Sequence, residues 1–381
     1  MPVLFSIIVI DLIGFGIVLP VLPFYADEYG ASGLALGVLF TSHSAMQVLF
    51  APLWGRLADR VGRRPVMLCT IAGTSVALVI LGLSDSLAQL FAGRILTGIF
   101  AANISVATAY ISDVTEEDER TRWMGMVGAS FGVGFILGPA IGGPLALLGY
   151  GVPMLVAAGL AAANFAYAVA VLKEPETHRP AAGEGAPRIG MLQNGTVRDL
   201  CITYFLFTLA VTQLETVMAY YMKDTFEYGV LGVSVILVAV AFVMAGIQGG
   251  AIRGLVARYG EKALLLSGVS LMSVAFFAMP WPQAVGLLLV PLILSAIGRA
   301  ISQPSMLGMV SFEATATTRG AVMGTFQASA SAARVLGPIA AGAIYDWHHP
   351  GPFLLAGLLL TIAVATAIRL PKPAPRGGAR P

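Results

Sequence analysis

The chain has 381 residues, of which 57% are hydrophobic and only 11% are charged, and its formal net charge is +2. Charged residues make up about a quarter of an ordinary soluble domain, so this composition excludes a soluble globular protein and makes lipid part of the solvent. The basic residues do not gather on one polar surface, and we therefore expect no nucleic-acid partner.

Twelve segments are candidates for membrane spans, each of which needs about 20 mostly apolar residues. In chain order they cover residues 2–24, 33–54, 65–84, 87–112, 122–147, 151–172, 200–222, 228–251, 263–281, 283–311, 320–344 and 351–369. Because backbone polar groups inside lipid must be satisfied within their own segment, each span is predicted to be a helix. The opening MPVLFSIIVI lacks a basic region and a cleavage site, so we expect it to start the first span.

The distribution of lysine and arginine predicts the orientation. One alternate set of loops, together with the C-terminal tail, carries 18 of the 22 basic residues, and the other set carries only Lys223. Basic loops stay in the cytoplasm, so both termini are predicted to be cytoplasmic. The remaining three basic residues, Arg94, Arg299 and Arg334, lie inside predicted spans.

The chain shows an internal repeat. A shift of 198 residues places GRLADRVGRR (55–64) on RGLVARYGEK (253–262), and GPAIGG (138–143) is echoed by GPIAAG (337–342). Such echoes predict two parallel six-helix halves. We expect an N-terminal half at 1–172, a cytoplasmic linker at 173–199, a C-terminal half at 200–370 and a cytoplasmic tail at 371–381, in an all-α membrane protein of twelve spans.

Several motifs resemble those of a known family. Signature positions within GRLADRVGRR are Gly55, Asp59, Arg60, Gly62, Arg63 and Arg64. Further matching stretches are DLIGFGIVLPVLP (11–23), RILTG (94–98), GVGFILGPAIGG (132–143) and EPETH (174–178). With these motifs the chain resembles the major facilitator superfamily over essentially its whole length, and within it the drug:proton antiporters of the tetracycline-exporter type. None of the motifs names a substrate.

The resemblance implies a transporter that works by alternating access about a mid-membrane cavity. It implies proton-coupled efflux of small amphipathic or drug-like molecules, in a monomer surrounded by lipid in a bacterial inner membrane. Two other functions stay open: uptake of a sugar, lipid or organic acid by the same fold, and a membrane sensor that transports nothing. Sodium in place of the proton also stays open.

Acidic side chains inside spans are candidates for proton coupling, because a charge at mid-bilayer costs about 3 kcal/mol even on lenient scales. Asp11, about halfway along the first span, is the leading candidate for the proton carrier, and the alternative is a structural partner for Arg94. Glu215 is the second candidate, for a proton or a cationic substrate, unless it is a boundary residue. Arg94 either switches between Asp11 and substrate or is a fixed counter-ion. The pattern suggests that each acid is offset by an arginine of its own half, with Arg299 in the second half.

Uncharged polar side chains in the spans are candidates for lining a substrate cavity, together with Arg299. They are His43, Gln47, Asn103, Gln213 and Gln327. A lone histidine is more often a satisfied residue of a bundle than a ligand, and His43 is open to both interpretations. Arg334 is open to lining, packing and gating roles.

The loop at 55–64 is predicted to form a cytoplasmic gate as well as a topology anchor. Asp59 is placed to meet the positive start of the eleventh span, and Asp113 ends the fourth span on the same face. Arg63, four residues after Asp59, is placed to bridge the two carboxylates. The predicted gate residues are Gly55, Asp59, Arg60, Gly62, Arg63 and Asp113.

The fifth span carries a small-residue motif. Its members are Gly134, Gly138, Pro139, Gly142 and Gly143. Close helix packing accounts for part of this pattern, and the resemblance adds a role in sealing the cavity against proton leak.

Enzyme chemistry finds no support in the sequence. There is no P-loop, and the glycine-rich stretches lie within spans rather than after a strand, so neither ATP nor a dinucleotide is expected as a cofactor. The two cysteines, Cys69 and Cys201, predict neither a disulfide nor a metal site. Energy is expected from an ion gradient or from the substrate's own gradient.

Overall fold

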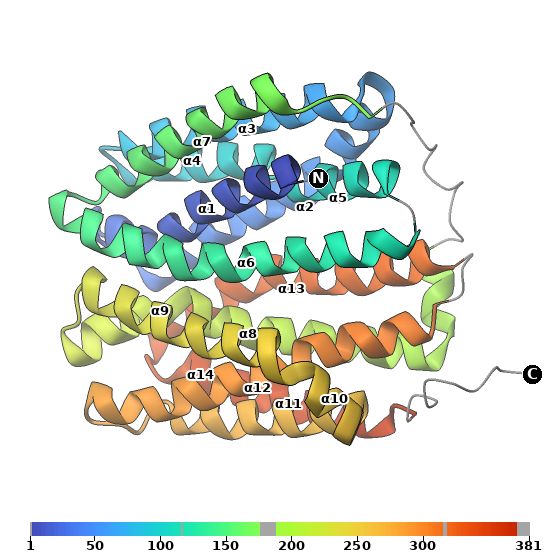
Figure 1. The fold of residues 1–381 in the computed structure, drawn as a ribbon. Coiled ribbons are helices and arrows are strands. Elements are labelled where there is room, and N and C mark those ends of the chain that lie inside the picture. Colours follow the sequence, from blue (N-terminus) through green and yellow to red (C-terminus); the bar gives the residue numbers. More distant parts are fainter. Residues whose placement is uncertain (1, 116, 176–187, 315–317, 372–381) are drawn as a thin grey trace, which may run out of the picture. The chain divides into compact units, whose positions relative to one another are not determined.

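The computed structural model describes residues 2–115, 117–175, 188–314 and 318–371, and every regular element in these ranges is a helix (Figure 1). The first part forms α1 (Pro2–Glu28), α2 (Gly33–Val61), α3 (Arg63–Gly82), α4 (Leu87–Phe100), α5 (Asn103–Val114), α6 (Glu117–Leu145), η1 (Ala146–Leu148) and α7 (Gly151–Val171). The rest forms η2 (Arg188–Gln193), α8 (Gly195–Phe226), α9 (Val230–Gly246), the π-helical η3 (Ile247–Ala251), α10 (Ile252–Tyr259), α11 (Glu261–Ala278), α12 (Val285–Phe312), α13 (Arg319–Trp347) and α14 (Gly351–Arg369). The predicted all-α fold is confirmed.

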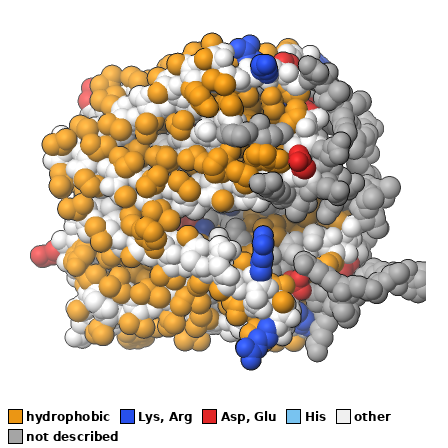
Figure 2. Space-filling view, viewed as in Figure 1, with side chains coloured by type: hydrophobic (Ala, Val, Ile, Leu, Met, Phe, Trp, Pro, Cys, Tyr) orange, Lys and Arg blue, Asp and Glu red, His pale blue; other side chains and the backbone are white. Residues whose placement is uncertain are grey.

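Eleven helical stretches within the described ranges are long and apolar enough to cross a bilayer. They coincide with eleven of the twelve predicted spans, and the twelfth is α13, which is long enough at 29 residues but rich in glycine, alanine and serine. Figure 2 shows hydrophobic side chains spread over the visible face, with few charged ones among them. The chain is an integral membrane protein.

The fourth span is broken at Ala101 and Ala102, between α4 and α5. A break inside a membrane frees backbone carbonyls, which need new donors. The side chains of α2 supply them: Gln47 Nε2 donates to the Ala101 carbonyl over 3.1 Å, and Trp54 Nε1 donates to the Ile99 carbonyl over 2.6 Å. The break is therefore stabilised by another helix, and it makes Asn103 the first residue of α5.

Helices α1 and α6 lie in contact along their length (Figure 1). A Cβ on Gly138 would come within 2.3 Å of the backbone of Gly16, and one on Gly134 within 2.7 Å of the Leu12 carbonyl. Only glycine permits this approach, which brings α1 against α6 just after Asp11. Helix α7 also packs against α1, and α3 packs against both α4 and α7.

The structure divides into two compact units, Met1–Gly183 with Thr216–Ala241, and Glu184–Glu215 with Phe242–Pro381. The second part of α8 and most of α9 thus group with the first six spans. The six-and-six division of the sequence repeat stays a prediction, and the predicted tail at 371–381 lies, except for residue 371, outside the described residues.

The predicted linker at 173–199 is partly helical. Helix α8 begins at Gly195, five residues before the predicted span, and η2 precedes it. Asn194 explains the early start, because its Oδ1 accepts from the backbone N–H groups of Thr196 and Val197, as a helix-capping side chain does.

Candidate functional site

Asp11 is hydrogen-bonded to a neutral side chain. Asn103 Nδ2 donates to Asp11 Oδ1 over 2.9 Å, and the hydroxyl of Thr70 on α3 donates in turn to Asn103 Oδ1. Asp11 is partly buried, whereas Asn103 and Thr70 are buried. Three helices therefore meet at the first candidate for proton coupling, through a chain of hydrogen bonds that sequence reasoning did not find.

Arg94 lies away from Asp11. Its guanidinium carbon is 5.6 Å from the centre of the Phe40 ring, the side chain is buried, and its Nε has no hydrogen-bond partner. Among the described residues it forms no ion pair, so the predicted pairing of Asp11 with Arg94 is absent from this structure. The reason is their positions along the span: Asp11 contacts Asn103, the first residue of α5, whereas Arg94 lies in α4, on the other side of the break at Ala101 and Ala102.

His43 has the surroundings of a satisfied residue in a bundle. It is buried, and its Nδ1 lies 3.2 Å from the Thr97 hydroxyl oxygen. Thr97 also donates to the Arg94 carbonyl, so its oxygen is free to accept the proton of His43 Nδ1. The ring of Phe15 lies 6.2 Å from that of His43. Gln47 is occupied at the break in the fourth span, so neither His43 nor Gln47 is hydrogen-bonded to Asp11 in the part of the chain that the structure describes.

The second acid does pair with an arginine. Arg299 Nη1 on α12 donates to Glu215 Oε1 on α8 over 2.7 Å, and the Glu215 side chain is 47% exposed. Arg299 Nε is buried without a partner. The pairing predicted for the second half is therefore present, in a setting that leaves the carboxylate partly exposed.

Gln213 and Gln327 differ in their settings. Gln213 is fully buried and donates to the carbonyls of Gly337 and Leu209, joining α8 to α13, while its Oε1 has no partner. Gln327 and Arg334 are exposed on α13. Their predicted places in the cavity stay predictions.

The loop after α2 forms a buried cluster of charges. Arg63 Nη1 donates to Asp59 Oδ1 over 2.6 Å and Arg63 Nε donates to Asp113 Oδ2 over 2.8 Å, so Arg63 bridges the two carboxylates. The side chains of Arg63 and Asp113 are 7% and 6% exposed, and that of Asp59 is 42% exposed. Arg60 is exposed and Gly55 has open space beside it. Asp59 and the start of α13 belong to different units, so their predicted meeting stays a prediction.

Glu174 completes this cluster, and sequence reasoning missed its contacts. Its two carboxylate oxygens accept from the backbone N–H groups of Arg63 and Arg64 at 2.6 and 2.8 Å, at the positive start of α3. Gly62 has φ of +105°, and a Cβ there would come within 2.6 Å of the Glu174 carboxylate. Arg64 Nη2 also donates to the Val169 carbonyl. The end of α7 is thus tied to the loop that carries the cluster.

Another ion pair lies at the helix ends opposite to the cluster around Arg63. Lys223 Nζ of α8 lies 2.5 Å from Asp27 Oδ2 of α1, and the Tyr220 hydroxyl donates to the Ala31 carbonyl over 3.0 Å. All four residues belong to the first unit. The one signal in the sequence was that Lys223 is the only basic residue of its set of loops.

The small-residue motif of the fifth span lies in α6. Gly134, Gly138 and Gly142 face the α1 backbone, and Gly143 faces α9, where a Cβ would come within 2.5 Å of the Ser234 hydroxyl. Pro139 lies inside the helix. Close packing therefore accounts for all four glycines, and a sealing role stays a prediction.

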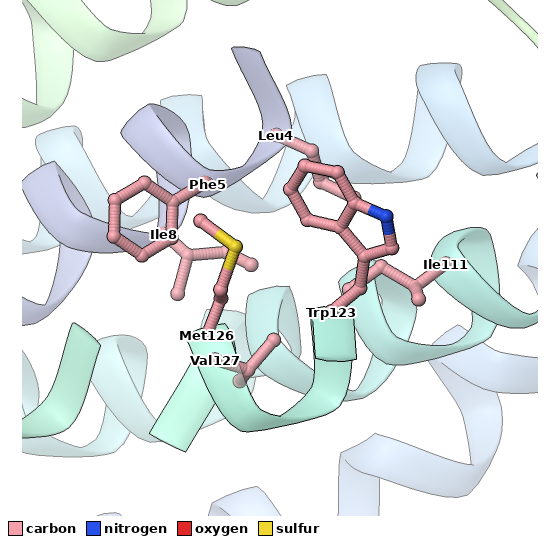
Figure 3. A pocket seen from close by; sticks show the side chains of 7 residues that line it. All are labelled: Leu4, Phe5, Ile8, Ile111, Trp123, Met126 and Val127. Atoms are coloured by element: carbon pink, nitrogen blue, oxygen red, sulfur yellow. The ribbon is translucent and has the colours of Figure 1, made fainter. Parts of the chain in front are cut away.

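An apolar crevice lies beside the start of α1 (Figure 3). Its lining consists of Leu4, Phe5 and Ile8 of α1, Ile111 of α5, and Trp123, Met126 and Val127 of α6. None of the predicted site residues is among them. No group of three or more potential metal ligands occurs among the described residues.

Comparison with known sequences points to transporters. The tetracycline resistance protein class D of Salmonella ordonez is 30% identical over 380 residues, covering 97% of this chain and 96% of that protein. The class B protein of Escherichia coli is 30% identical, covering 90% of this chain and 88% of its own. Multidrug resistance protein 2 of Bacillus subtilis is 27% identical, covering 95% and 92%.

Solved structures agree. The human organic anion transporter MFSD10 (TETRAN) has a TM-score of 0.74 at 25% identity, covering 96% of this chain and 98% of its own. A bacterial homologue of the human lysosomal transporter Spinster has a TM-score of 0.82 at 15% identity, covering 96% and 95%, which shows the fold alone.

A family model described as the Major Facilitator Superfamily matches the chain twice, over residues 4–253 and 200–381. The two matches overlap over residues 200–253, and the family and its structural neighbours are transporters rather than enzymes. The first match alone covers more than half of the sequence, and this chain belongs to the Major Facilitator Superfamily.

Proposed function

We propose that the protein exports small amphipathic, drug-like molecules in exchange for protons, by alternating access. The observation that carries the proposal is the surroundings of Asp11, a carboxyl group within a span that is hydrogen-bonded to neutral Asn103 and forms no ion pair among the described residues. An adjacent arginine would hold the carboxylate ionised. Without one, Asp11 is able to gain and lose a proton during the cycle.

Glu215 has the second role in this proposal. Its carboxylate is paired with Arg299, and its exposed fraction of 47% lets a ligand reach it. A cationic group of a substrate, or a proton, would compete with Arg299 for this carboxylate. Arg94, which has no carboxylate partner among the described residues, is available to a polar group of the substrate. The candidates for lining residues remain His43, Gln47, Asn103, Gln213 and Gln327.

The two groups of ion pairs serve as gates in the proposed cycle. The cluster of Asp59, Arg63 and Asp113 lies at the end of the first unit that the basic loops predict to be cytoplasmic, and the pair of Lys223 and Asp27 lies at the opposite end. Breaking one set favours opening on its own side. The free energy of each set thus biases the equilibrium between the two states.

The membrane setting follows from the same reasoning. The ratio of basic residues between the loop sets supports cytoplasmic termini, and the bacterial efflux relatives support an inner membrane. One proton that crosses about 100 mV releases about 2.3 kcal/mol, which sustains a roughly fifty-fold substrate gradient. We propose that the protein acts as a monomer that is surrounded by lipid and binds protons and a small-molecule substrate.

The test is substrate pumping by purified protein in proteoliposomes, with tetracycline as the first compound because relatives carry that name. An imposed pH gradient should drive wild-type protein to accumulate substrate against its gradient. Asp11→Asn should abolish this accumulation while it retains counterflow, in which labelled and unlabelled substrate exchange without a pH gradient. Asp85→Asn, in the exposed loop before α4, is the matched control and should pump normally.

Two outcomes would contradict the proposal. Uphill accumulation by Asp11→Asn at the wild-type rate would show that Asp11 is not the proton carrier. Accumulation that depends on a sodium gradient and not on the pH gradient would show that sodium is the coupling ion. Whole cells that lack the gene should retain more labelled substrate, and lower retention would indicate uptake instead.

A further inference from the structure

We propose that Asn103 is a positioning residue for Asp11, and that Thr70 holds Asn103 in the orientation that this requires. The proposal rests on the proposed role of Asp11 as proton carrier. Asn103 Nδ2 lies 2.9 Å from Asp11 Oδ1, and Thr70 Oγ1 contacts Asn103 Oδ1. Because the amide oxygen accepts from Thr70, the NH₂ group is turned toward the carboxylate.

Local structure does not account for Asn103. The N-cap residue of α5 is Ala102, and the side-chain hydrogen bonds of Asn103 go to Asp11 and Thr70 rather than to a backbone group. The carbonyls freed by the break are satisfied by Gln47 and Trp54 instead. A buried carboxamide inside a membrane is costly unless it is hydrogen-bonded, and the partners of this one are Asp11 and Thr70.

The chain of hydrogen bonds can run in either direction, because an amide and a hydroxyl each both donate and accept. When Asp11 is ionised, the NH₂ of Asn103 donates to it and the Thr70 hydroxyl donates to Asn103 Oδ1. When Asp11 has gained a proton, a half-turn of the amide lets the Asp11 O–H donate to Oδ1. The NH₂ then donates to Thr70 Oγ1.

Thr70 can accept that bond because its own proton has a second destination. The carbonyl oxygens of Val66 and Met67, in the preceding turn of α3, each lie 3.0 Å from Thr70 Oγ1. In both protonation states of Asp11, the amide oxygen, one amide N–H and the Thr70 hydroxyl each therefore have a partner. A side chain with only donors, such as lysine or arginine, would favour the ionised state alone.

Other titratable groups on the helices around α1 are occupied or distant. On α5, Asp113 is bound to Arg63, and the Tyr110 hydroxyl donates to the Lys173 carbonyl. On α6, the acidic and basic residues all lie at 117–122, at least 12 residues and about 18 Å before Gly134, which packs beside Leu12.

The remaining neighbours lie on α1 itself, α7 and α4. Helix α7 has no charged residue, and its one tyrosine is Tyr167. The other acids of α1 are Asp27 and Glu28, at its far end. Arg94 of α4 lies over Phe40. Asn103 is therefore the side chain through which the surroundings act on the ionisation of Asp11.

The test is the pH profile of proton-driven transport in three variants. Asn103→Leu removes the hydrogen bonds to Asp11 and Thr70 while keeping the side-chain volume. It should raise the pH of half-maximal transport that Asp11 sets by about one unit, because a hydrogen bond to an ionised group is about twice as strong as one between neutral groups. Thr70→Val should shift it in the same direction by about half as much, and Thr70→Ser should restore the wild-type midpoint. Ser75→Ala removes another hydroxyl of α3, bonded only to the Ala158 carbonyl, and should leave the midpoint unchanged.

A second measurement reports on Asp11 directly. Infrared difference spectra between high and low pH should contain a carboxyl band that disappears in Asp11→Asn and moves in frequency in Asn103→Leu. Counterflow without a pH gradient shows that each variant is folded, and if Asn103→Leu does not fold, Thr70→Val serves as the test. In an Asp11→Asn background, Asn103→Leu should leave the pH profile of counterflow unchanged.

The outcomes separate this inference from the function on which it rests. If Asp11→Asn abolishes pumping and Asn103→Leu keeps both the wild-type midpoint and the wild-type carboxyl band, Asn103 has no positioning role and the proposed function stands. A shift that persists without Asp11 would overturn the inference in the same way. If Asp11→Asn pumps normally, the proposed function fails first.

Discussion

The cluster around Arg63 predicts that two carboxylates bound to the same guanidinium differ in their contribution to stability. The Asp113 side chain is 6% exposed and the Asp59 side chain is 42% exposed, while Arg63 itself is 7% exposed. Removing one partner of a buried ion pair costs about 3 kcal/mol or more, because the other charge stays buried. An exposed pair contributes at most about 1 kcal/mol. Asp113→Asn should therefore destabilise the protein roughly three times as much as Asp59→Asn.

The assay is thermal unfolding in detergent, followed by a dye that reacts with thiols. Cys201 is buried and becomes reactive on unfolding, and exposed Cys69 is first replaced by serine to remove the background. Both asparagine variants are made in that background and again together with Arg63→Gln. Without Arg63, Asp113→Asn should no longer destabilise the protein, because it removes a buried carboxylate that has lost the Arg63 guanidinium, and Asp59→Asn should have a small effect.

Equal shifts of the unfolding midpoint for Asp59→Asn and Asp113→Asn would refute this reasoning, because burial would then not determine the cost. A larger shift for Asp59→Asn would refute it more strongly. A difference that persists with Arg63→Gln would show that the carboxylates act through other partners.

Three further predictions concern the glycines and the second ion pair. Gly62→Ala should lower the unfolding midpoint more than Gly260→Ala does. Both glycines have positive φ, which costs about 1–3 kcal/mol for alanine, but of the two only Gly62 has a carboxylate where the new Cβ would lie. Gly138→Ala should reduce folded yield, measured by size-exclusion profile, because its Cβ would overlap the α1 backbone at 2.3 Å, whereas Gly132→Ala, with open space, should match the wild type. Lys223→Gln should increase labelling of engineered cysteines accessible from outside, since it breaks the bond to Asp27; unchanged labelling would exclude a gating role for that pair.

Much of the fold was predictable because hydropathy and charge act locally. Segments of about 20 apolar residues must be helices in lipid, and the predicted span at 351–369 has the bounds of α14. The bridge from Arg63 to Asp59 was predicted from their separation of four residues, although Gly62, with φ of +105°, ends α2 between them. Asp113 followed once the alternation of basic loops placed both loop ends on the same side of the membrane.

The break in the fourth span was not predictable. The stretch FAANIS at 100–105 contains neither glycine nor proline, and the break is stabilised by donors from α2 that lie 54 and 45 residues away along the chain. The same break sets the depth of Asn103, and therefore which side chain meets Asp11. Sequence reasoning paired Asp11 with Arg94 on charge, without knowing the depth of Arg94 relative to Asp11.

By itself, the sequence determined that the chain crosses a membrane in twelve helices, that its halves repeat and that its charges gather in one set of loops. Whether a segment crosses the membrane depends on its free energy of transfer from water to lipid, and this free energy is a sum over residues that are neighbours in the sequence. Only the tertiary structure decided that Asp11 is hydrogen-bonded to an amide rather than to a guanidinium, that Glu174 caps α3 and that Lys223 forms an ion pair with Asp27. Hydrogen bonds and ion pairs act over about 3 Å, so a register difference of one helical turn, about 5.4 Å, is enough to exchange one partner for another.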